Sequence, residues 1–259
     1  IEHPDVKRML MSMRSQTEAT RALAYYVAGQ LDIACRHPDI ETRQASQSLV
    51  DLLTPVVKAW GSDTSIEVAS TGIQVHGGMG FIEETGAAQF YRDARITAIY
   101  EGTNGIQAND LIGRKIGREN GETAKVLICL IRDFLDSAKS NDDEDLAVLC
   151  EALTEAVTAL ETATNWVCET WKSDVAAVAA GAVPYLRLLG LIGGGWMMAR
   201  SAEISIGSLS KGNGDPTFHR TKIMSARFFA DHFLTEAPGL ARSVTNGWTS
   251  VSAAAADQF

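Results

Sequence analysis

The sequence has no basic surplus and no long hydrophobic run. Its 23 lysines and arginines stand against 32 aspartates and glutamates, which gives a formal net charge of −9. Nucleic-acid binding depends on cationic side chains that displace counterions from phosphates, so we expect no nucleic-acid partner. A membrane span needs roughly 18 consecutive apolar residues. The most apolar segment, AVPYLRLLGLIGGGWMMA, is interrupted by Arg187 and a cluster of glycines, so we expect no transmembrane segment.

Cysteine is scarce and follows no pattern. No CxxC pair and no matched spacing occur among the four residues, Cys35, Cys129, Cys150 and Cys168. This favours buried free thiols in a reducing cytosol over disulfides. The five histidines include no ligand pair at helical spacing, so we predict no metal site. The chain does not begin with methionine and IEHPDVKRML does not resemble a signal peptide, so we expect the natural start to lie upstream.

Proline is also scarce, with six in 259 residues, and most long segments have none. This favours helix over strand, because proline interrupts helices. Apolar residues recur at spacings of three and four, as in amphipathic helices. We expect Pro38 to end the first helix and Pro55 to kink the second or to start a new one. The expected helices cover residues 6–34, a second helix through 45–73, the segment EETGAAQFYRDA, 104 or 105 to about 116, 126–135, 146–160, 175–210 and, as the last strong helix, 217–234.

No segment shows the period-2 alternation of a strand over more than a few residues. We therefore predict an all-α protein of two helical bundles in series. Polar and glycine residues cluster in GRENGET, residues 117–123, and mark a boundary between two apolar patterns. This predicts a first domain over residues 1–117 and a second over 118–259. The weakly patterned tail SVSAAAADQF is expected to fray.

Glycine is not scarce, and the first of two notable patches is QVHGGMGF. Each glycine within a helix costs about 1 kcal/mol relative to alanine, so we expect HGGMGF to be non-helical. Adjacent glycines let backbone N–H groups approach a ligand closely, which suits a phosphate or pyrophosphate. The spacing fits neither a Walker loop nor a dinucleotide-binding GxGxxG motif. A tight turn between helices explains the patch as well, with His76 as a structural hydrogen-bonding residue.

The second patch is IYEGTNGIQ, which we expect to lie in a connecting loop. Glu101 follows several apolar residues, so its surroundings are expected to be apolar, and desolvation would make its carboxylate a proton acceptor near neutral pH. Gly102 leaves room for a substrate, and Thr103 adds a hydroxyl. The alternatives are that Glu101 pairs with Arg92 or Arg95, or caps the helix that follows.

The two patches, with QFYRDARI between them, closely resemble the C-terminal helical domain of the acyl-CoA dehydrogenases. The resemblance covers roughly residues 1–117 and is continuous through EVASTGIQVHGGMGFIEETGAAQFYRDARITAIYEGTNGIQ. The opening IEHPDVKRMLMSMRSQTEATRALAYY and the extra helical domain from about Glu119 are similar to a larger subgroup of that family. Its bacterial members include enzymes that act on long-chain and on methylthio-propanoyl thioesters.

The resemblance implies a reaction and a catalytic base. In the family, FAD takes a hydride from the β-carbon of an acyl-CoA thioester while a glutamate removes the α-proton. A trans-2-enoyl-CoA forms, and the electrons pass to an electron-transfer flavoprotein. The resemblance implies that Glu101 is this base and that its N–H helps to polarise the thioester carbonyl. It places Tyr100 and Gly102 in the substrate site.

The resemblance also implies a cofactor site shared between subunits. FAD contacts are implied for five residues, Gln74, Gly77, Gly78, Thr103 and Asn104. Many family members have glutamine where this chain has Gly105, so no contact is carried over there. The glycine patch usually binds the FAD of the neighbouring subunit, which implies a homo-oligomer, at least a dimer. A cytoplasmic bacterial enzyme is expected.

The family's amino-terminal helical domain and middle β-domain have no counterpart in this sequence. The resemblance therefore implies a C-terminal fragment of a longer enzyme, and we expect the fragment to fold without binding FAD or oxidising acyl-CoA. Three alternatives remain: an acyl-CoA oxidase, a DNA-associated flavoprotein relative and a helical scaffold without ligand. The acidic balance and the intact YEGT argue against the second. Four tryptophans are expected in the core rather than in a site: Trp166, Trp171, Trp196 and Trp248.

Overall fold

The computed structural model describes residues 1–258, which form an all-α protein as predicted, with no strand in that range. The part predicted as the first domain contains α1 (Pro4–Arg36), α2 (Ile40–His76), α3 (Gly78–Phe81), the 3₁₀ turn η1 (Glu83–Thr85), α4 (Ala87–Thr97), α5 (Asn104–Asp110) and the π-helical segment η2 (Leu111–Gly117). The part predicted as the second domain contains α6 (Glu122–Ala138), α7 (Glu144–Thr170), α8 (Val175–Ala180), α9 (Ala182–Ser210), α10 (Pro216–His232), η3 (Leu234–Glu236), α11 (Ala237–Asn246), α12 (Trp248–Ser252) and η4 (Ala256–Gln258).

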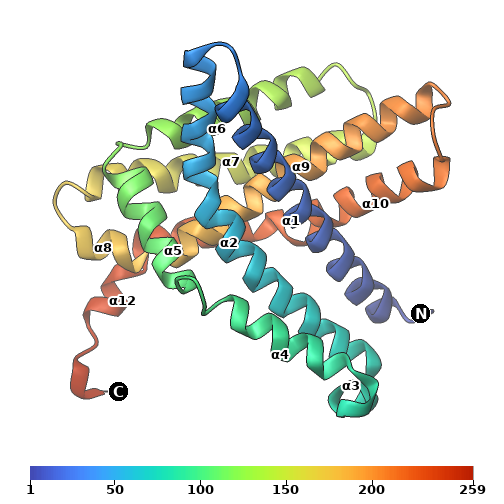
Figure 1. The fold of residues 1–259 in the computed structure, drawn as a ribbon, viewed down its shortest axis with the longest axis horizontal. Coiled ribbons are helices and arrows are strands. Elements are labelled where there is room, and N and C mark those ends of the chain that lie inside the picture. The colour runs from blue at the N-terminus through green and yellow to red at the C-terminus, as the bar shows by residue number, and fades with distance from the viewer. Residues whose placement is uncertain (259) are drawn as a thin grey trace.

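The first two helices form a long antiparallel hairpin, and α4 lies alongside the second half of α2 (Figure 1). Pro4 occupies the first turn of α1, where its missing N–H has no intrahelical acceptor in any case. Asp39 caps α2, because its carboxylate accepts the N–H of Thr42 at 2.8 Å. Pro55 is buried within α2 and does not start a new helix. The helix therefore runs unbroken past Pro55 to the glycine patch.

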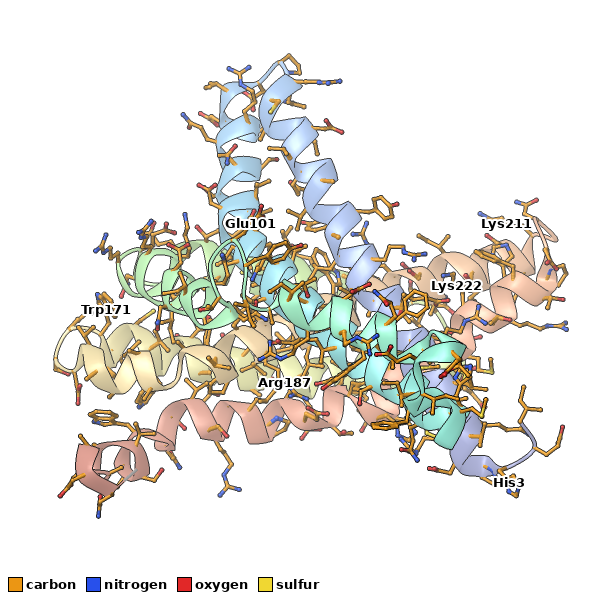
Figure 2. All side chains as sticks on the ribbon, turned by 60° about the horizontal axis from the view of Figure 1, so that its bottom comes forward. His3, Glu101, Trp171, Arg187, Lys211 and Lys222 are labelled. Atoms are coloured by element: carbon orange, nitrogen blue, oxygen red, sulfur yellow. The ribbon has the colours of Figure 1, made fainter. Side chains whose placement is uncertain are left out.

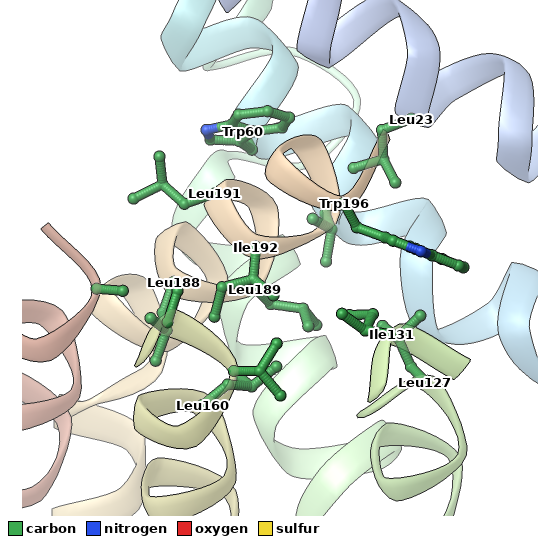
Figure 3. Packing of buried hydrophobic residues seen from close by; sticks show 14 of the residues in the cluster. Leu23, Trp60, Leu127, Ile131, Leu160, Leu188, Leu189, Leu191, Ile192 and Trp196 are labelled. Carbon is green, nitrogen blue, oxygen red and sulfur yellow. The ribbon is translucent and has the colours of Figure 1, made fainter. Parts of the chain in front are cut away.

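Helix α9 is the centre of the molecule. Its residues 188–199 are all buried, as expected for a helix that is apolar on every side. Glycines let neighbouring helices approach closely: a Cβ added at Gly190 would lie 2.5 Å from Cγ of Trp60, and one at Gly193 would lie 3.2 Å from a methyl group of Leu23. Figure 3 shows Trp60 and Leu23 packed against this helix. The glycine cluster that interrupts the apolar run in the sequence is thus a helix-packing surface.

The two helical domains share one hydrophobic core. Helix α9 contacts α1, α2 and α5 of the first domain as well as α7, α10 and α11 of the second. The buried cluster accordingly runs from Ala19 in α1 to Val244 in α11. The domains follow one another along the chain, but neither packs as an isolated bundle.

Several helix boundaries differ from the prediction. The helix expected over EETGAAQFYRDA starts only at Ala87, because Gly86 has φ 78° and separates it from η1. The predicted helix over 175–210 is split into α8 and α9 at Gly181, where a Cβ would lie 3.1 Å from the Val244 carbonyl oxygen. The helix expected to be the last, α10, is followed by α11 and α12. HGGMGF is not wholly non-helical: α2 extends to His76, and Gly78–Phe81 forms the single turn α3.

The cysteines are free, but only Cys168 is buried, while Cys35 and Cys129 are exposed. The prediction that all four are buried is therefore wrong. Trp196 is buried, and Trp171 packs on Gly117 of η2. None of the helices in residues 1–258 is both long and apolar enough to cross a bilayer. The same residues contain no group of three or more His, Cys, Asp or Glu side chains that could hold a metal ion.

Candidate active-site loop

Glu101 lies in the short loop that joins α4 to α5 beside α2 (Figure 2). Helix α4 ends where the N–H groups of Ile99 and Tyr100 both donate to the Ile96 carbonyl, at 2.9 and 3.1 Å. The chain then turns back, and the N–H of Asn104 donates to the Ala98 carbonyl at 3.1 Å. Residues 98–104, here called the base loop, are therefore closed by a backbone hydrogen bond.

The backbone of the base loop is strained at Glu101. Its φ of 53° lies in the left-handed region, and Gly102 follows with φ of 84°. A side chain other than glycine in this region costs on the order of 1 kcal/mol, because Cβ approaches the carbonyl oxygen. Such residues persist where the surrounding structure holds them, and they cluster at functional sites. The conformation thus favours a functional role for Glu101 over a merely local one.

The side chain of Glu101 is exposed, and so is that of Tyr100 beside it. Ile96 and Ile99 are 51% and 47% exposed, so the apolar residues that precede Glu101 face outward. The expected burial of Glu101 in apolar surroundings is therefore absent from residues 1–258. The sequence neighbours are apolar, but nothing within the described chain covers them.

Neither alternative role predicted for Glu101 is found. Among residues 1–258, no ion pair includes Glu101 or Arg95, and Arg92 pairs with Glu83 at 3.5 Å. Helix α5 is capped by Thr103, whose hydroxyl accepts the N–H of Ile106 at 3.3 Å. The backbone N–H of Glu101 also has no acceptor in this part of the chain. A carboxylate and an N–H group at the same residue are therefore both free.

Asn104 fixes the base loop to α2. Its amide nitrogen donates to the Ala59 carbonyl at 3.1 Å and to a carboxylate oxygen of Asp63 at 2.7 Å. Its amide oxygen accepts from Nζ of Lys58 at 2.8 Å, and Ser62 lies within hydrogen-bonding distance as well. The side-chain amide of Asn104 is thus fully used by hydrogen bonds within the chain. Its side chain has no free donor for the predicted contact with the cofactor.

Sequence reasoning missed the three polar residues of α2 that meet the base loop, Lys58, Ser62 and Asp63. Lys58 also donates to the Gly102 carbonyl at 2.7 Å. No local pattern reveals these contacts, since the partners lie more than 40 residues apart. In the sequence, Lys58 looks like any other lysine on a helix.

The local structure explains why two positions of the glycine patch are glycine, but it does not explain the third. Gly77 ends α2 with φ 60° and ψ −143°, a conformation that glycine alone adopts readily. A Cβ at Gly80 would collide with the Ile73 carbonyl. At Gly78 a Cβ would meet nothing within 4 Å, and φ is not positive. His76 bonds the Gly72 carbonyl at 2.8 Å, the structural role that we predicted. Nothing in residues 1–258 thus explains a glycine at position 78.

The glycine patch and the base loop form two separate sites. The base loop meets α2 at Lys58, whereas the patch follows His76 at the far end of that helix. At about 1.5 Å per residue, about 27 Å of helix separates these two positions. Gln74, Gly77 and Gly78 are exposed. A groove of about 700 Å³ between α1, α2 and α4 is lined by His76 and not by Glu101.

Two protein-family models match the chain. Residues 1–116 match the acyl-CoA dehydrogenase, C-terminal domain. Residues 127–255 match the model described as acetyl-CoA dehydrogenase C-terminal like.

Curated relatives match nearly the whole chain. It is 44% identical over 236 residues to 3-methylmercaptopropionyl-CoA dehydrogenase of Ruegeria pomeroyi, covering 91% of this chain and 40% of that protein. It is 34% identical over 241 residues to the broad-specificity linear acyl-CoA dehydrogenase FadE5 of Mycobacterium tuberculosis, covering 90% and 39%. The chain therefore spans about 40% of the length of these relatives.

Solved structures share the fold at lower identity. The crystal structure of an acyl-CoA dehydrogenase from Bacillus anthracis, complexed with FAD, has a TM-score of 0.72 at 18% identity, over 99% of this chain and 44% of that one. Caenorhabditis elegans ACDH-11 in complex with C11-CoA has a TM-score of 0.70 at 20% identity, over 94% and 40%. The chain belongs to the acyl-CoA dehydrogenase family, and it comprises the family's C-terminal helical domain followed by a second helical domain.

Proposed function

We propose that this chain is the C-terminal portion of an FAD-dependent acyl-CoA dehydrogenase, with the domain boundary at residues 117/118 and Glu101 as the catalytic base. The observation that carries the proposal is the strained, unpaired Glu101 in a loop whose two ends are joined by a backbone hydrogen bond. A glutamate that served only stability would be expected to relax or to find a partner. The relatives of this chain named above are acyl-CoA dehydrogenases, which supports the same assignment.

The reaction that we propose begins with loss of the α-proton of an acyl-CoA thioester to the Glu101 carboxylate. The Glu101 N–H, which has no acceptor within residues 1–258, is free to donate to the thioester carbonyl, where negative charge develops as the proton leaves. Gly102 presents no side chain, and Tyr100 lies exposed beside the base. In the whole enzyme, further segments would cover these exposed residues, exclude water and desolvate the carboxylate.

The cofactor fits the glycine patch better than it fits Asn104. Gly77 and Gly78 are exposed, and a Cβ at either would meet nothing within 4 Å, so the backbone there is open to close approach by a phosphate group. Gln74 is exposed on the preceding turn, and Thr103 at the base loop keeps a hydroxyl. We assign these four residues to FAD binding. FAD supplies the acceptor for the hydride that leaves the β-carbon.

The distance between the two sites supports a shared arrangement. Because about 27 Å of helix separates them, one copy of the chain would contact the cofactor of its partner through the glycine patch and its own substrate through the base loop. We therefore propose a homo-oligomer of at least two copies. An electron-transfer flavoprotein is the proposed electron acceptor.

The test is turnover by the whole enzyme that contains this chain, against a panel of acyl-CoA thioesters with a dye acceptor. Glu101→Gln keeps the size of the side chain and removes the base, so we expect turnover to fall at least about 100-fold, as for loss of a general base. Glu84→Gln is the matched control, since Glu84 is an exposed glutamate on the turn before α4.

Unchanged turnover in Glu101→Gln would remove the proposal and favour a scaffold without catalytic function. Equal losses in Glu101→Gln and Glu84→Gln would also contradict it, because the effect would not be specific to the base. Stoichiometric hydrogen peroxide in air, without a dye, would assign an oxidase instead.

A further inference from the structure

We propose that Lys58 is a positioning residue for Glu101, acting from α2 to hold the base loop in the conformation that presents the carboxylate. The inference rests on the proposed function of Glu101. It concerns a different residue and a different element of the fold, and it is tested separately.

The contacts of Lys58 are short and bind two parts of the loop at once. Its ammonium donates to the Gly102 carbonyl at 2.7 Å and to the amide oxygen of Asn104 at 2.8 Å. Hydrogen bonds from a charged donor are shorter and stronger than neutral ones. Lys58 itself is half-buried on α2. The residue directly after Glu101 is thereby anchored to a rigid helix.

Other polar groups on the same face of α2 complete the anchor. Ala59 and Asp63 accept from the amide nitrogen of Asn104, and Ser62 lies beside its amide group. Residues i, i+1, i+4 and i+5 of a helix lie on one face, so these four positions form a single surface about one turn long. The base loop is therefore attached to one defined place on α2.

Within residues 1–258, no other hydrogen bond to the carbonyls of Glu101 and Gly102 comes from outside the loop and α5. The Glu101 carbonyl accepts from the side-chain amide of Gln107 at 3.4 Å, which is long, and Gln107 belongs to α5, the helix that the loop enters. Within residues 1–258, Lys58 is thus the one donor from a separate element to these carbonyls. Without it, the strained residue could relax while α5 stayed in place.

A second lysine in the chain supplies a matched control. Nζ of Lys125 donates to the Asn120 carbonyl at 3.0 Å, in a turn that also has positive φ values. The chemistry of the contact is the same, but the turn lies between η2 and α6 and is not part of the base loop. Loss of Lys125 should therefore affect stability without affecting catalysis.

The experiment uses the whole flavin-containing enzyme and four variants, Lys58→Met, Lys58→Arg, Lys125→Met and Glu101→Gln. Turnover, KM and flavin content are measured, together with exchange of the substrate α-hydrogen with D₂O, which reports proton transfer alone. For Lys58→Met we expect kcat and exchange to fall together by about 10- to 100-fold, because small misplacements of a catalytic group have effects of this size. KM and flavin content should stay within about twofold. Lys58→Arg should recover most of the rate, and Lys125→Met should match the unmodified enzyme.

Wild-type exchange in a folded Lys58→Met variant would overturn the inference. So would parallel loss of flavin and rate, or an equal loss in Lys125→Met, since each indicates a general structural effect. Should Lys58→Met not fold, Lys58→Gln takes its place. The glutamine amide is uncharged and shorter than lysine, so we expect the same fall in kcat and exchange. If Glu101→Gln itself keeps full exchange, Glu101 is not the base. The proposed function then fails, and the inference about Lys58 fails with it.

Discussion

Two turns in this chain have the same uncommon backbone and differ in everything around it. In each, a residue other than glycine has a positive φ and a glycine with positive φ follows: Glu101–Gly102 with 53° and 84°, and Asn120–Gly121 with 52° and 71°. In each, a lysine Nζ also donates to a carbonyl of the pair. They are the two positions in residues 1–258 where a non-glycine residue is left-handed.

The difference lies in residue type and burial. Asparagine is several-fold enriched in the left-handed region, whereas glutamate is not. Gly121 is buried, and a Cβ there would lie 2.9 Å from Sγ of Cys168, so this turn is part of the packed core. Gly102 and Glu101 are exposed. Folding accounts for the Asn120 turn, but it gives no reason for a glutamate at residue 101, and this contrast is the structural case for a function there.

The largest effect on stability is expected for alanine at the two glycines. Gly121→Ala adds strain at positive φ and a clash with Cys168, so we expect a loss of about 3 kcal/mol in the free energy of unfolding. At Gly102 an added Cβ would meet the flexible end of Gln107 at 3.2 Å and, at an ordinary contact distance of 3.8 Å, a methyl group of Ile106. Gly102→Ala should therefore lower the free energy of unfolding by only about 1 kcal/mol, while turnover of the whole enzyme should fall sharply. Denaturant titration and turnover assays give both quantities. The reverse order of stability losses would contradict the contrast between the two turns.

The next effect concerns the buried surroundings of Gly121. Thr164, which lies against that glycine, is hydrogen bonded to the hydroxyl of Tyr185 at 2.8 Å. Burial raises the pKa of Tyr185. Tyrosine in the unfolded chain ionises near pH 10, so this residue should reduce stability by about 1 kcal/mol per pH unit above that value, until its folded-state pKa is reached.

The variant Tyr185→Phe isolates this contribution. At neutral pH its free energy of unfolding should be about 1 kcal/mol lower than that of the unmodified protein, because the hydrogen bond is missing. Above about pH 10 its free energy of unfolding should fall less steeply with pH than that of the unmodified protein. Turnover at neutral pH should be unaffected, because the Tyr185 hydroxyl is hydrogen bonded to Thr164 and not to the base loop. Identical pH profiles of stability for the two proteins would show that Tyr185 does not have the role assigned here.

Helix caps provide a smaller test of the same contrast. Thr103→Val removes the cap of α5, and Asp143→Ala removes the cap of α7, where the carboxylate accepts the N–H groups of Asp145 and Leu146. Each should lower the free energy of unfolding by about 1 kcal/mol. Turnover should fall for Thr103→Val alone. Full turnover in Thr103→Val would argue that the end of the base loop need not be held.

The fold was largely predictable because its signals are local. Apolar spacing located most helices. Local signals also explain helix starts that the structure shows, such as the caps at Asp39 and Asp143. The break at Gly181 was missed because an apolar run continues on both sides. Helix α11 was missed because it has only 10 residues and has proline and glycine near its start, residues that are typical of turns. The shared core was not predictable either, since the fit of Gly190 against Trp60 joins positions 130 residues apart.

The candidate site was predictable only in part, for a related reason. YEGT and the glycine patch could be found by resemblance to a family, and the structure gives them separate locations. Lys58 could not be found, because its contacts with Gly102 and Asn104 span 44 and 46 residues and a lysine on a helix is common. The exposure of Glu101 was also missed, because apolar neighbours in a sequence can face outward as easily as inward.

The most direct test of the account compares Glu101→Gly with Asn120→Gly. Glycine relieves left-handed strain, so Glu101→Gly should raise the free energy of unfolding by about 0.5 kcal/mol, after the entropic cost of glycine, while turnover is lost. Asn120→Gly should change stability by less, since asparagine already tolerates the conformation, and turnover should persist. Denaturant unfolding followed by tryptophan fluorescence, with turnover of the same preparations, measures both. A Glu101→Gly variant that is clearly destabilised, or that keeps its turnover, would show that this glutamate serves folding rather than catalysis.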